Sequence, residues 1–345
     1  MLAATLVDEA PANAAETNYN FSVKVTNVDT PKPAGDQVQV KLQACSYNHR
    51  DNWIRQGLYP GVKSGSVLGS DGVGVVSEGD DALTGKQVMI VPGQGWDSDP
   101  RGPEGRYGML GLLPLPGTWG EYIVVDKKDV VQCPPHLSTA EASALPLAGL
   151  TAYRATFTKG QVRKGDNVLV TGIGGGVALF ALQFAVAAGA NVYVTSSKED
   201  KIERAIQLGA KGDNWHKDLQ TLLGKGQINT VIDGAGGKAY NVYPRVMAIG
   251  GIVVNYGQTS AKDPVTFPMT YVLKNIDLRG STMGSRQEFY DMVEFVDKHK
   301  IKPIVSQVWQ GLTESNIEAA FTVMRNGEQF GKLVIELADT THNKL

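Results

Sequence analysis

The sequence predicts an α/β protein of two domains, one a doubly wound parallel sheet and the other rich in β-strands. Three observations predict this fold. The chain has 345 residues, which exceeds the usual size of a single domain. Short strand patterns fill the sequence as far as Asp129. From about Leu137 onward strand and helix patterns alternate, as is typical of a parallel sheet covered by helices.

Composition excludes several classes of protein. Hydrophobic residues make up 42% and charged residues 20% of the chain, which are ordinary values for a soluble globular protein. The formal net charge of −2 provides no positive field for nucleic acid or an anionic membrane. The two cysteines are too few for a disulfide framework, and no apolar run approaches the ~18 residues of a membrane span. We therefore expect a cytoplasmic protein that acts on a small molecule.

The N-terminal part of the chain is predicted to form short strands joined by turns. Alternating or glycine-bounded apolar residues indicate strands at Phe21–Val25, Gln37–Ala44, Gly72–Val76 and Gln87–Val91. The stretch Pro92–Gly117 is rich in Pro and Gly and has no clear period. Long loops of this kind in compact domains are often functional, so we expect this one to help shape a substrate pocket.

A helix-start signal marks the change to the second pattern. Ser138 is followed three residues later by Glu141, the spacing of a capping box, and an Ala-rich helix is expected to run from there to Arg154. Further strands, an amphipathic helix and a last strand are predicted at Thr230–Asp233, Gly251–Tyr256, Ile276–Gly280, Gln287–Lys300 and Gly331–Leu337. We expect the last strand to rejoin the first domain. The predicted domains are residues 1–137 with 284–345, and residues 138–283.

A glycine-rich turn begins the second domain. The apolar run Val168–Val170 leads into the spacing Gly172-x-x-Gly175-x-x-Ala178, then a helix-period segment and a β-rich run, Val192–Thr195. In a dinucleotide-binding βαβ unit the pyrophosphate lies on the helix N-terminus, where close approach of the backbone requires small residues. The order strand, turn, helix, strand therefore predicts a Rossmann nucleotide-binding domain.

The end of the second strand of this unit favours NADPH over NADH. Sites for NAD usually carry Asp or Glu there, to accept hydrogen bonds from the ribose hydroxyls. This chain has Ser196, Ser197 and Lys198, with Lys201 a turn later. Hydroxyl and ammonium groups suit a 2′-phosphate, which a carboxylate would repel. The alternative is that Lys198 and Lys201 are solvated helix charges.

Several motifs together resemble the medium-chain dehydrogenase/reductase superfamily over nearly the whole chain. Tyr47–Pro60 looks like the quinone oxidoreductase branch, Leu145–Tyr153 like the domain-joining helix, and Gly331–Val334 like the C-terminal strand. Gly95–Arg101 is similar to a zinc-lacking, alcohol-dehydrogenase-like subgroup. The resemblance implies a GroES-like catalytic domain beside the Rossmann domain, and a homodimer formed through the strand at Ile276–Gly280.

The positions of the family's catalytic zinc ligands hold unsuitable residues. Alignment with the family places Asn48, Ser70 and Leu147 there, whereas zinc prefers thiolate, imidazole or carboxylate ligands. Two cysteines also cannot supply the family's four-cysteine structural site. Cys45 and His49 are too few for a site of their own, and Cys45 is expected to be a buried apolar residue. We therefore expect no bound metal.

Without zinc, the chemistry expected is reduction of an acceptor that delocalises charge, a quinone or an α,β-unsaturated carbonyl. The candidate catalytic residues are Asn48, as donor to the carbonyl oxygen, Asp51, to orient that amide or a water, and Trp53 and Tyr59, as a stacking wall. Each has a structural alternative: Asn48 and Asp51 as turn or helix caps, Trp53 and Tyr59 as core. Tyr47, Tyr107 or water would supply the proton.

The resemblance also implies a set of cofactor-binding residues. The set comprises Thr151, Gly172, Gly175, Gly176, Val177, Ser196, Ser197, Lys201, Trp215, Asn255, Tyr256 and Gly257. The predicted function is an NADPH-dependent, zinc-independent reductase of quinones or activated alkenes. Two alternatives stay open, a carbonyl reductase of the same fold and an NADPH-binding redox sensor without catalysis.

Overall fold

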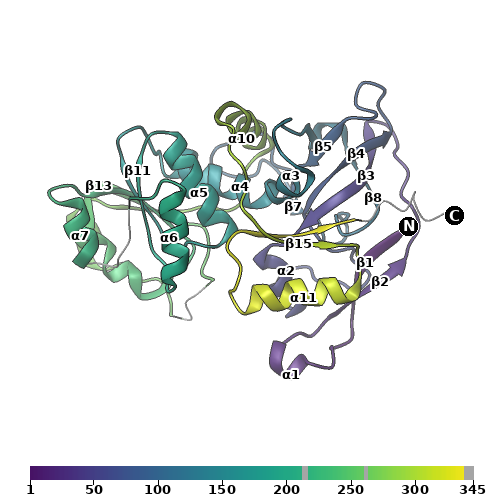
Figure 1. Cartoon of the computed structure of the whole chain (residues 1–345), viewed down its shortest axis with the longest axis horizontal. Coiled ribbons are helices and arrows are strands. Elements are labelled where there is room, and N and C mark those ends of the chain that lie inside the picture. The colour runs from purple at the N-terminus through teal and green to yellow at the C-terminus, as the bar shows by residue number, and fades with distance from the viewer. Residues whose placement is uncertain (212–216, 260–262, 338–345) are drawn as a thin grey trace. The chain divides into compact units, whose positions relative to one another are not determined.

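The computed structural model describes residues 1–211, 217–259 and 263–337. The chain divides into two compact units, the first formed by Met1–Leu147 with Ser285–Leu345 and the second by Ala148–Gly284 (Figure 1). In the parts of the chain just given, no helix is both long and apolar enough to cross a membrane.

The first unit is built on a mainly antiparallel sheet, as the short alternating strands predict. Its elements are β1 (Leu2–Val7), α1 (Ala14–Thr17), β2 (Ser22–Asn27), β3 (Gln37–Ser46), α2 (His49–Arg55), β4 (Asp71–Glu78), β5 (Gln87–Ile90), β6 (Gly93–Gln94), β7 (Gly108–Met109), β8 (Tyr122–Asp126), η1 (Lys127–Asp129), β9 (Val130–Gln132), α3 (Thr139–Ala144), α10 (Arg286–His299), β15 (Val305–Gln310), α11 (Glu314–Arg325) and β16 (Lys332–Glu336).

The large sheet of this unit contains strands from both the N-terminal and the C-terminal part of the chain. Its strand order is β15-β16-β3-β4-β5-β9, and β8 also pairs with β3. Strands β15 and β16 pair in parallel, and the other pairs are antiparallel. The C-terminal strand β16 runs antiparallel to β3, with Val334 opposite Ser46, which confirms that the last strand rejoins the first domain. Burial of Val38, Val40 and Leu42 in β3 explains the alternating pattern, because successive side chains of a strand point to opposite faces.

The capping box predicted at Ser138 is present. Ser138 Oγ accepts a hydrogen bond from the backbone N–H of Glu141 at 3.2 Å, and Glu141 Oε2 accepts one from the N–H of Ser138 at 2.8 Å. The helix it begins is not continuous to Arg154, however. It divides into α3 and α4 (Pro146–Tyr153), followed by the π-helix η2 (Arg154–Lys159), because Pro146 lacks an N–H to continue the ladder. Helix α3 packs against β3, β4 and β16, so residues 138–147 lie with the first unit and not with the second as predicted, whereas Gly284 lies with the second.

The second unit is the predicted parallel sheet. Its elements are α4 from Ala148 onward, η2, β10 (Asn167–Val170), α5 (Gly176–Ala187), β11 (Asn191–Val194), α6 (Glu199–Gln207), α7 (Lys217–Leu223), β12 (Ile228–Asp233), η3 (Gly237–Asn241), α8 (Tyr243–Val246), β13 (Met247–Asn255), α9 (Met269–Leu273) and β14 (Asp277–Gly280). The strand order is β11-β10-β12-β13-β14, and every pair is parallel. From β10 the chain connects first to β11 on one side and then to β12 on the other side of β10. The place between β10 and β12 where the connections change side is the switch point at which such sheets bind ligands.

Candidate functional site

Strand pairing brings a lysine to the place where the resemblance puts a metal. Ser46 pairs with Val334 of β16 on one side and with Asp71 of β4 on the other. Lys332 lies two residues before Val334 and therefore on the same face of β16. Asn48 follows the end of β3 and begins helix α2. The strand register thus places Lys332, Asn48 and Asp71 together.

The Lys332 ammonium group is buried and fully hydrogen-bonded. Its Nζ atom donates to the backbone oxygen of Tyr47 at 2.5 Å, to Asn48 Oδ1 at 2.6 Å and to Asp71 Oδ2 at 2.9 Å. The side chains of Lys332 and Asp71 are only 4% and 0% exposed, so the pair is desolvated. Three acceptors match the three hydrogens of the ammonium group, which is how a buried charge is tolerated.

Asp71 and Lys332 together fix the orientation of the Asn48 amide. Asn48 Nδ2 donates to Asp71 Oδ2 at 2.9 Å, while its Oδ1 accepts from Lys332. Asp71 Oδ1 accepts from the backbone N–H of Leu147 at 2.8 Å, and Ser46 Oγ donates to Asp71 Oδ2 at 2.8 Å. Nδ2 has a second hydrogen, whose contact with Ser70 Oγ is long, at 3.5 Å. That second N–H is therefore the most weakly engaged donor of the Asn48 amide.

These residues do not fit a zinc ion. An amide, a hydroxyl and an aliphatic chain occupy the three positions aligned with the ligands, and the ammonium group of Lys332 already supplies a positive charge there. Zinc needs thiolate, imidazole or carboxylate ligands, and the one carboxylate of the cluster, Asp71, is occupied by four donors. Across residues 1–211, 217–259 and 263–337, no three His, Cys, Asp or Glu side chains gather in a group that could hold a metal ion.

Asp51 caps helix α2 and does not orient the Asn48 amide. Its Oδ2 atom accepts the backbone N–H of Asn48 at 2.8 Å, which is the capping alternative. Complete burial raises the pKa of Asp51 to about 6, although the nearby charge of Arg50 opposes the shift. Lys332 and Asp71, and not Asp51, hold the Asn48 amide, and a role for Asp51 in orienting a water stays a prediction.

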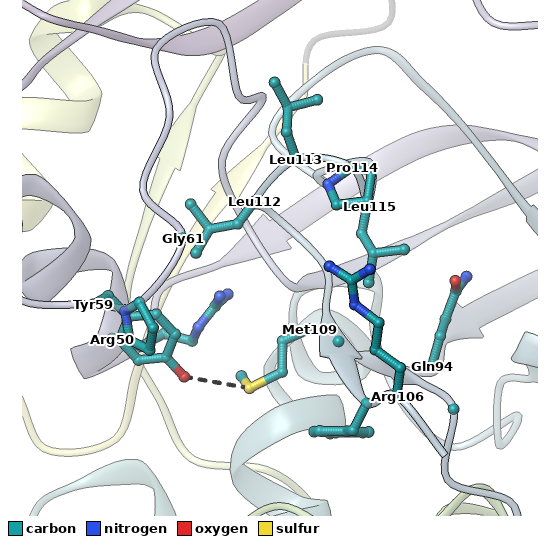
Figure 2. Close-up of a pocket in the computed structure, with 14 residues that line it drawn as sticks. Arg50, Tyr59, Gly61, Gln94, Arg106, Met109, Leu112, Leu113, Pro114 and Leu115 are labelled. Carbon is teal, nitrogen blue, oxygen red and sulfur yellow. Dashed lines mark hydrogen bonds between the residues drawn. The ribbon is translucent and has the colours of Figure 1, made fainter.

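The two aromatic candidates lie in different surroundings. The Tyr59 ring lines a pocket, and its hydroxyl contacts Met109 Sδ at 3.4 Å (Figure 2). Trp53 is half-buried and its ring meets His49 edge-on, with centroids 5.7 Å apart. Trp53 is not among the residues that line that pocket, so the structure does not bring the two rings together as one wall of it.

The glycine-rich turn has the features of a phosphate cradle. Gly172 and Gly174 have φ values of +66° and +112°, which side chains rarely adopt. Helix α5 begins after Gly175 without a side-chain cap, which leaves its first N–H groups available to an anion. A Cβ atom at Gly174 would lie 2.6 Å from Lys201 Cδ and 3.1 Å from Lys201 Nζ. Lys201 of α6 therefore lies over the turn.

The surroundings of Lys201 are positively charged. Its pKa is lowered, first by burial and then by the ammonium group of Lys198, and Asp200 opposes this effect. A bound anion would relieve the repulsion between these cations. Ser196 accepts a hydrogen bond from the backbone N–H of Lys198 at 3.1 Å, which shapes the loop that also carries Ser197.

The predicted cofactor residues at the end of β13 and just after it lie near a buried carboxylate, Asp233, at the end of β12. Asn255 Nδ2 contacts Asp233 Oδ2 at 3.3 Å, Tyr240 Oη at 2.6 Å and the Gly257 carbonyl oxygen at 3.1 Å. Thr171 Oγ1 donates to Asp233 Oδ1 at 2.5 Å. The Tyr256 ring packs directly against Gly234, which is possible because glycine lacks a Cβ atom that would overlap the ring. Asp233 thus ties together the ends of β10, β12 and β13.

Thr151 belongs to an element apart from the glycine-rich turn and from the Asp233 cluster. It is buried in α4, with its hydroxyl 3.7 Å from Met283 Sδ. The prediction for Trp215 is not covered, because Trp215 lies outside the described residues.

Sequence reasoning missed Lys332, Asp71 and Asp233. Each carries a charge inside or at the end of an apolar strand, at Lys332-Leu-Val-Ile, Asp71-Gly-Val and Val231-Ile-Asp233. A charge in a buried strand needs a partner. A charged residue within or beside an apolar strand segment was therefore a signal that the sequence contained.

Comparison with known proteins agrees with the fold and with the glycine-rich turn. The protein-family model described as "Alcohol dehydrogenase GroES-like domain" matches residues 34–135, and the family model described as "Zinc-binding dehydrogenase" matches residues 176–298. The chain belongs to the medium-chain dehydrogenase/reductase superfamily, whose members are nucleotide-dependent oxidoreductases.

Individual relatives place it among the zinc-type alcohol dehydrogenase-like oxidoreductases. It is 42% identical to "Zinc-type alcohol dehydrogenase-like protein YogA" of Leptosphaeria maculans, over 95% of this chain and 98% of that one. A crystal structure titled as an NAD-dependent alcohol dehydrogenase superposes with a TM-score of 0.85 at 31% identity, covering 98% of this chain and 100% of the other. An acryloyl-coenzyme A reductase of Sulfurisphaera tokodaii is 24% identical over 91% of this chain and 96% of its own length.

Proposed function

We propose that the protein is an NADPH-dependent reductase that delivers hydride to quinones or α,β-unsaturated carbonyl compounds without a catalytic metal. The observation that carries the proposal is the hydrogen-bonded cluster of Lys332, Asn48 and Asp71 in place of a zinc site. The likeness to an acryloyl-coenzyme A reductase, whose name describes reduction of an activated alkene, supports the same chemistry.

The choice of NADPH depends on the end of β11 and the start of α6. No carboxylate follows β11 before Glu199, and Lys201 lies over the glycine-rich turn beside Lys198. Ser196, Ser197 and Lys201 would hold the 2′-phosphate, and the uncapped start of α5 at Gly175, Gly176 and Val177 would hold the pyrophosphate. The bound cofactor supplies the hydride.

The remaining chemistry is assigned to Asn48. Addition of hydride to an enone or quinone produces an enolate or hydroquinone anion, which requires a positioned donor at the oxygen. The second N–H of Asn48 Nδ2 would be such a donor, with the substrate oxygen taking the place of its long 3.5 Å contact to Ser70 Oγ. Its direction is set because Lys332 and Asp71 hold the other positions of the amide. A simple ketone would form a localised alkoxide, which one amide stabilises less well than a Lewis acid does.

A second candidate is a carbonyl reductase of the same fold. The relatives named as alcohol dehydrogenase or alcohol dehydrogenase-like proteins favour it. A positioned N–H donor would act on the carbonyl oxygen in both cases.

Steady-state oxidation of NADPH separates these functions. With benzoquinone, an enone such as 3-penten-2-one and an unactivated aldehyde, we expect turnover of the first two that exceeds turnover of the aldehyde by at least about tenfold. Activity should survive prolonged dialysis against a chelator, and the purified protein should contain no stoichiometric zinc. Turnover of the aldehyde alone would contradict the leading proposal and favour the second candidate. Binding of NADPH without turnover of any acceptor would favour a non-catalytic role.

We also propose that the protein forms a homodimer through β14. This strand is at the edge of the parallel sheet, and its Leu278 is 38% exposed. The nearby helix α9 exposes Met269, Val272 and Leu273, at 68%, 53% and 74%. An open edge strand beside exposed apolar side chains is a natural interface between identical copies.

Charge introduced at this edge should abolish dimerisation. In size-exclusion chromatography with light scattering we expect twice the chain mass of 36.9 kDa for the unmodified protein, and a monomer for Leu278→Lys combined with Leu273→Lys. A buried charge without a partner costs several kcal/mol, which exceeds the surplus stability of many interfaces. Leu222→Lys, at an exposed apolar residue of α7, is the matched control and should leave the dimer intact. A double variant that stays dimeric would place the interface elsewhere.

A further inference from the structure

A pocket of about 710 Å³ lies within the first unit, between the start of α2 and the loop Pro92–Gly117. Its walls are largely apolar and include Tyr59, Met109, Leu112 and Leu115 (Figure 2). A hollow of this size, lined by apolar groups with a few polar ones, is typical of a small-molecule site.

The charge on the pocket lining has one sign. Two arginines, Arg50 and Arg106, contribute to the lining, and none of the lining residues is acidic. Figure 2 shows the two arginine side chains on opposite sides of the pocket. Within the described ranges, the Arg106 side chain makes no hydrogen bond or ion pair, and Arg50 makes no ion pair. A cavity with cationic groups and low-dielectric walls concentrates a positive field, which favours an anionic ligand.

Arg50 has hydrogen-bonding capacity that the protein leaves unused. The residue is 5% exposed, and its Nη1 atom donates to the backbone oxygen of Leu110 at 2.7 Å. Its guanidinium group lies over the Tyr59 ring, 5.0 Å from the ring centroid. Nε and Nη2, by contrast, are buried and have no acceptor in the part of the chain that the structure describes. Buried donors without partners are rare and costly, so these two point to a missing acceptor.

A second unused donor belongs to the same pocket. The hydroxyl of Tyr107, a lining residue, is also buried without a hydrogen-bond partner among the residues described. Burial raises the pKa of Tyr107 well above its ordinary value, and the charge of Arg50 opposes the shift. The phenol is therefore neutral near pH 7 and able to donate a hydrogen bond.

The neighbouring carboxylate does not satisfy Arg50. Asp51 uses its Oδ2 atom to accept the backbone N–H of Asn48, and its Oδ1 atom likewise finds no donor among the described residues. Asp51 thus interacts with Arg50 through its charge but accepts none of the hydrogen bonds that Nε and Nη2 can donate.

We propose that this pocket binds an anionic group, a carboxylate or a phosphate, carried on a small apolar molecule. Arg50 donates to the anion, Tyr107 provides a further O–H, and Arg106 on the opposite side adds attraction. Tyr59, Met109 and the leucines receive the apolar part. Binding at this pocket does not depend on the proposed hydride transfer, so it is measured without cofactor or turnover.

Isothermal titration with three probes tests the proposal and distinguishes the two kinds of anion. Cinnamate provides a carboxylate, phenyl phosphate a phosphate, and cinnamamide is the neutral match of cinnamate. At least one anion should bind tenfold or more tightly than cinnamamide. A preference for cinnamate identifies a carboxylate site, and a preference for phenyl phosphate identifies a phosphate site. Equal binding of all three probes, or no binding of either anion, would overturn the proposal.

Variants then assign the donors. Tyr107→Phe removes a hydroxyl that makes no hydrogen bond to any described residue, so the fold should be unaffected while affinity for the anion falls about threefold to tenfold. Arg50→Met should remove the preference for an anion over cinnamamide, and Arg50→Lys should retain part of it, provided that circular dichroism shows both variants folded. Arg163→Gln, an exposed arginine of the other unit, is the matched control and should bind as the unmodified protein does. Unchanged anion binding in both Tyr107→Phe and folded Arg50→Met would show that these residues do not form the site.

Discussion

Replacing Lys332 by Met should lower the free energy of unfolding by about 3–5 kcal/mol, because removal of one partner leaves the other charge buried and uncompensated. Asp71 is 0% exposed and would lose its only ion pair among the described residues. The Asn48 amide would lose the donor that holds its Oδ1 atom. Urea denaturation followed by circular dichroism measures the first effect, and kcat with the best acceptor should fall by about tenfold or more as the amide loses its orientation.

A double variant separates charge compensation from simple packing. Asp71→Asn combined with Lys332→Met removes both charges, and we expect it to recover at least half of the lost stability, because the uncompensated charge is gone. Stability that falls further in the double variant would mean that the methylene chain of Lys332 matters more than its charge. A single variant within about 1 kcal/mol of the unmodified protein would contradict the desolvated pair that the geometry defines.

Replacing Lys201 by Ala should weaken NADPH binding by about tenfold to a hundredfold and leave NADH within about twofold, because only NADPH carries the 2′-phosphate and one charge-assisted contact is lost. Lys201 lies over the glycine-rich turn, with its Nζ atom 3.1 Å from the position of a Cβ at Gly174. Quenching of protein fluorescence by each cofactor gives both dissociation constants without requiring turnover.

The matched control for this prediction is Lys225→Ala, at an exposed lysine of the same unit. It should change neither affinity. Equal weakening of NADPH and NADH by Lys201→Ala would mean that the lysine supports the turn itself, and not the 2′-phosphate. Tight binding of NADH by the unmodified protein would favour the NAD-dependent chemistry named for the alcohol dehydrogenase relative.

Local patterns in the sequence determined most of the fold. The alternation in β3, the capping box at Ser138 and the glycine spacing at Gly172–Gly175 each depend on neighbours within a few residues, and such patterns reflect local sterics and hydrogen bonding. The break at Pro146 was also encoded locally. The prediction of one continuous helix gave too little weight to the missing N–H of that proline.

Only part of the Asn48 cluster could be predicted from the sequence. Asn48 and Ser70 were recognised as unsuitable zinc ligands because side-chain chemistry alone decides that. The sequence by itself could not show what takes the metal's place, because Lys332 and Asp71 are 261 positions apart. Pairing of β3 with both β16 and β4 brings them together.

The pocket lined by Arg50 and Tyr107 could be identified only from the tertiary structure. Arg50 and Tyr107 belong to a helix and to a loop without any period, so no pattern relates them. The fold buries both, and among the described residues Arg50 Nε and Nη2 and the Tyr107 hydroxyl have no partner. The sequence therefore determined the two-domain architecture and the glycine-rich turn, because these depend on periodicity and backbone preference. Only the tertiary structure decided which charges are paired and which are left for a ligand, because pairing depends on distance and desolvation.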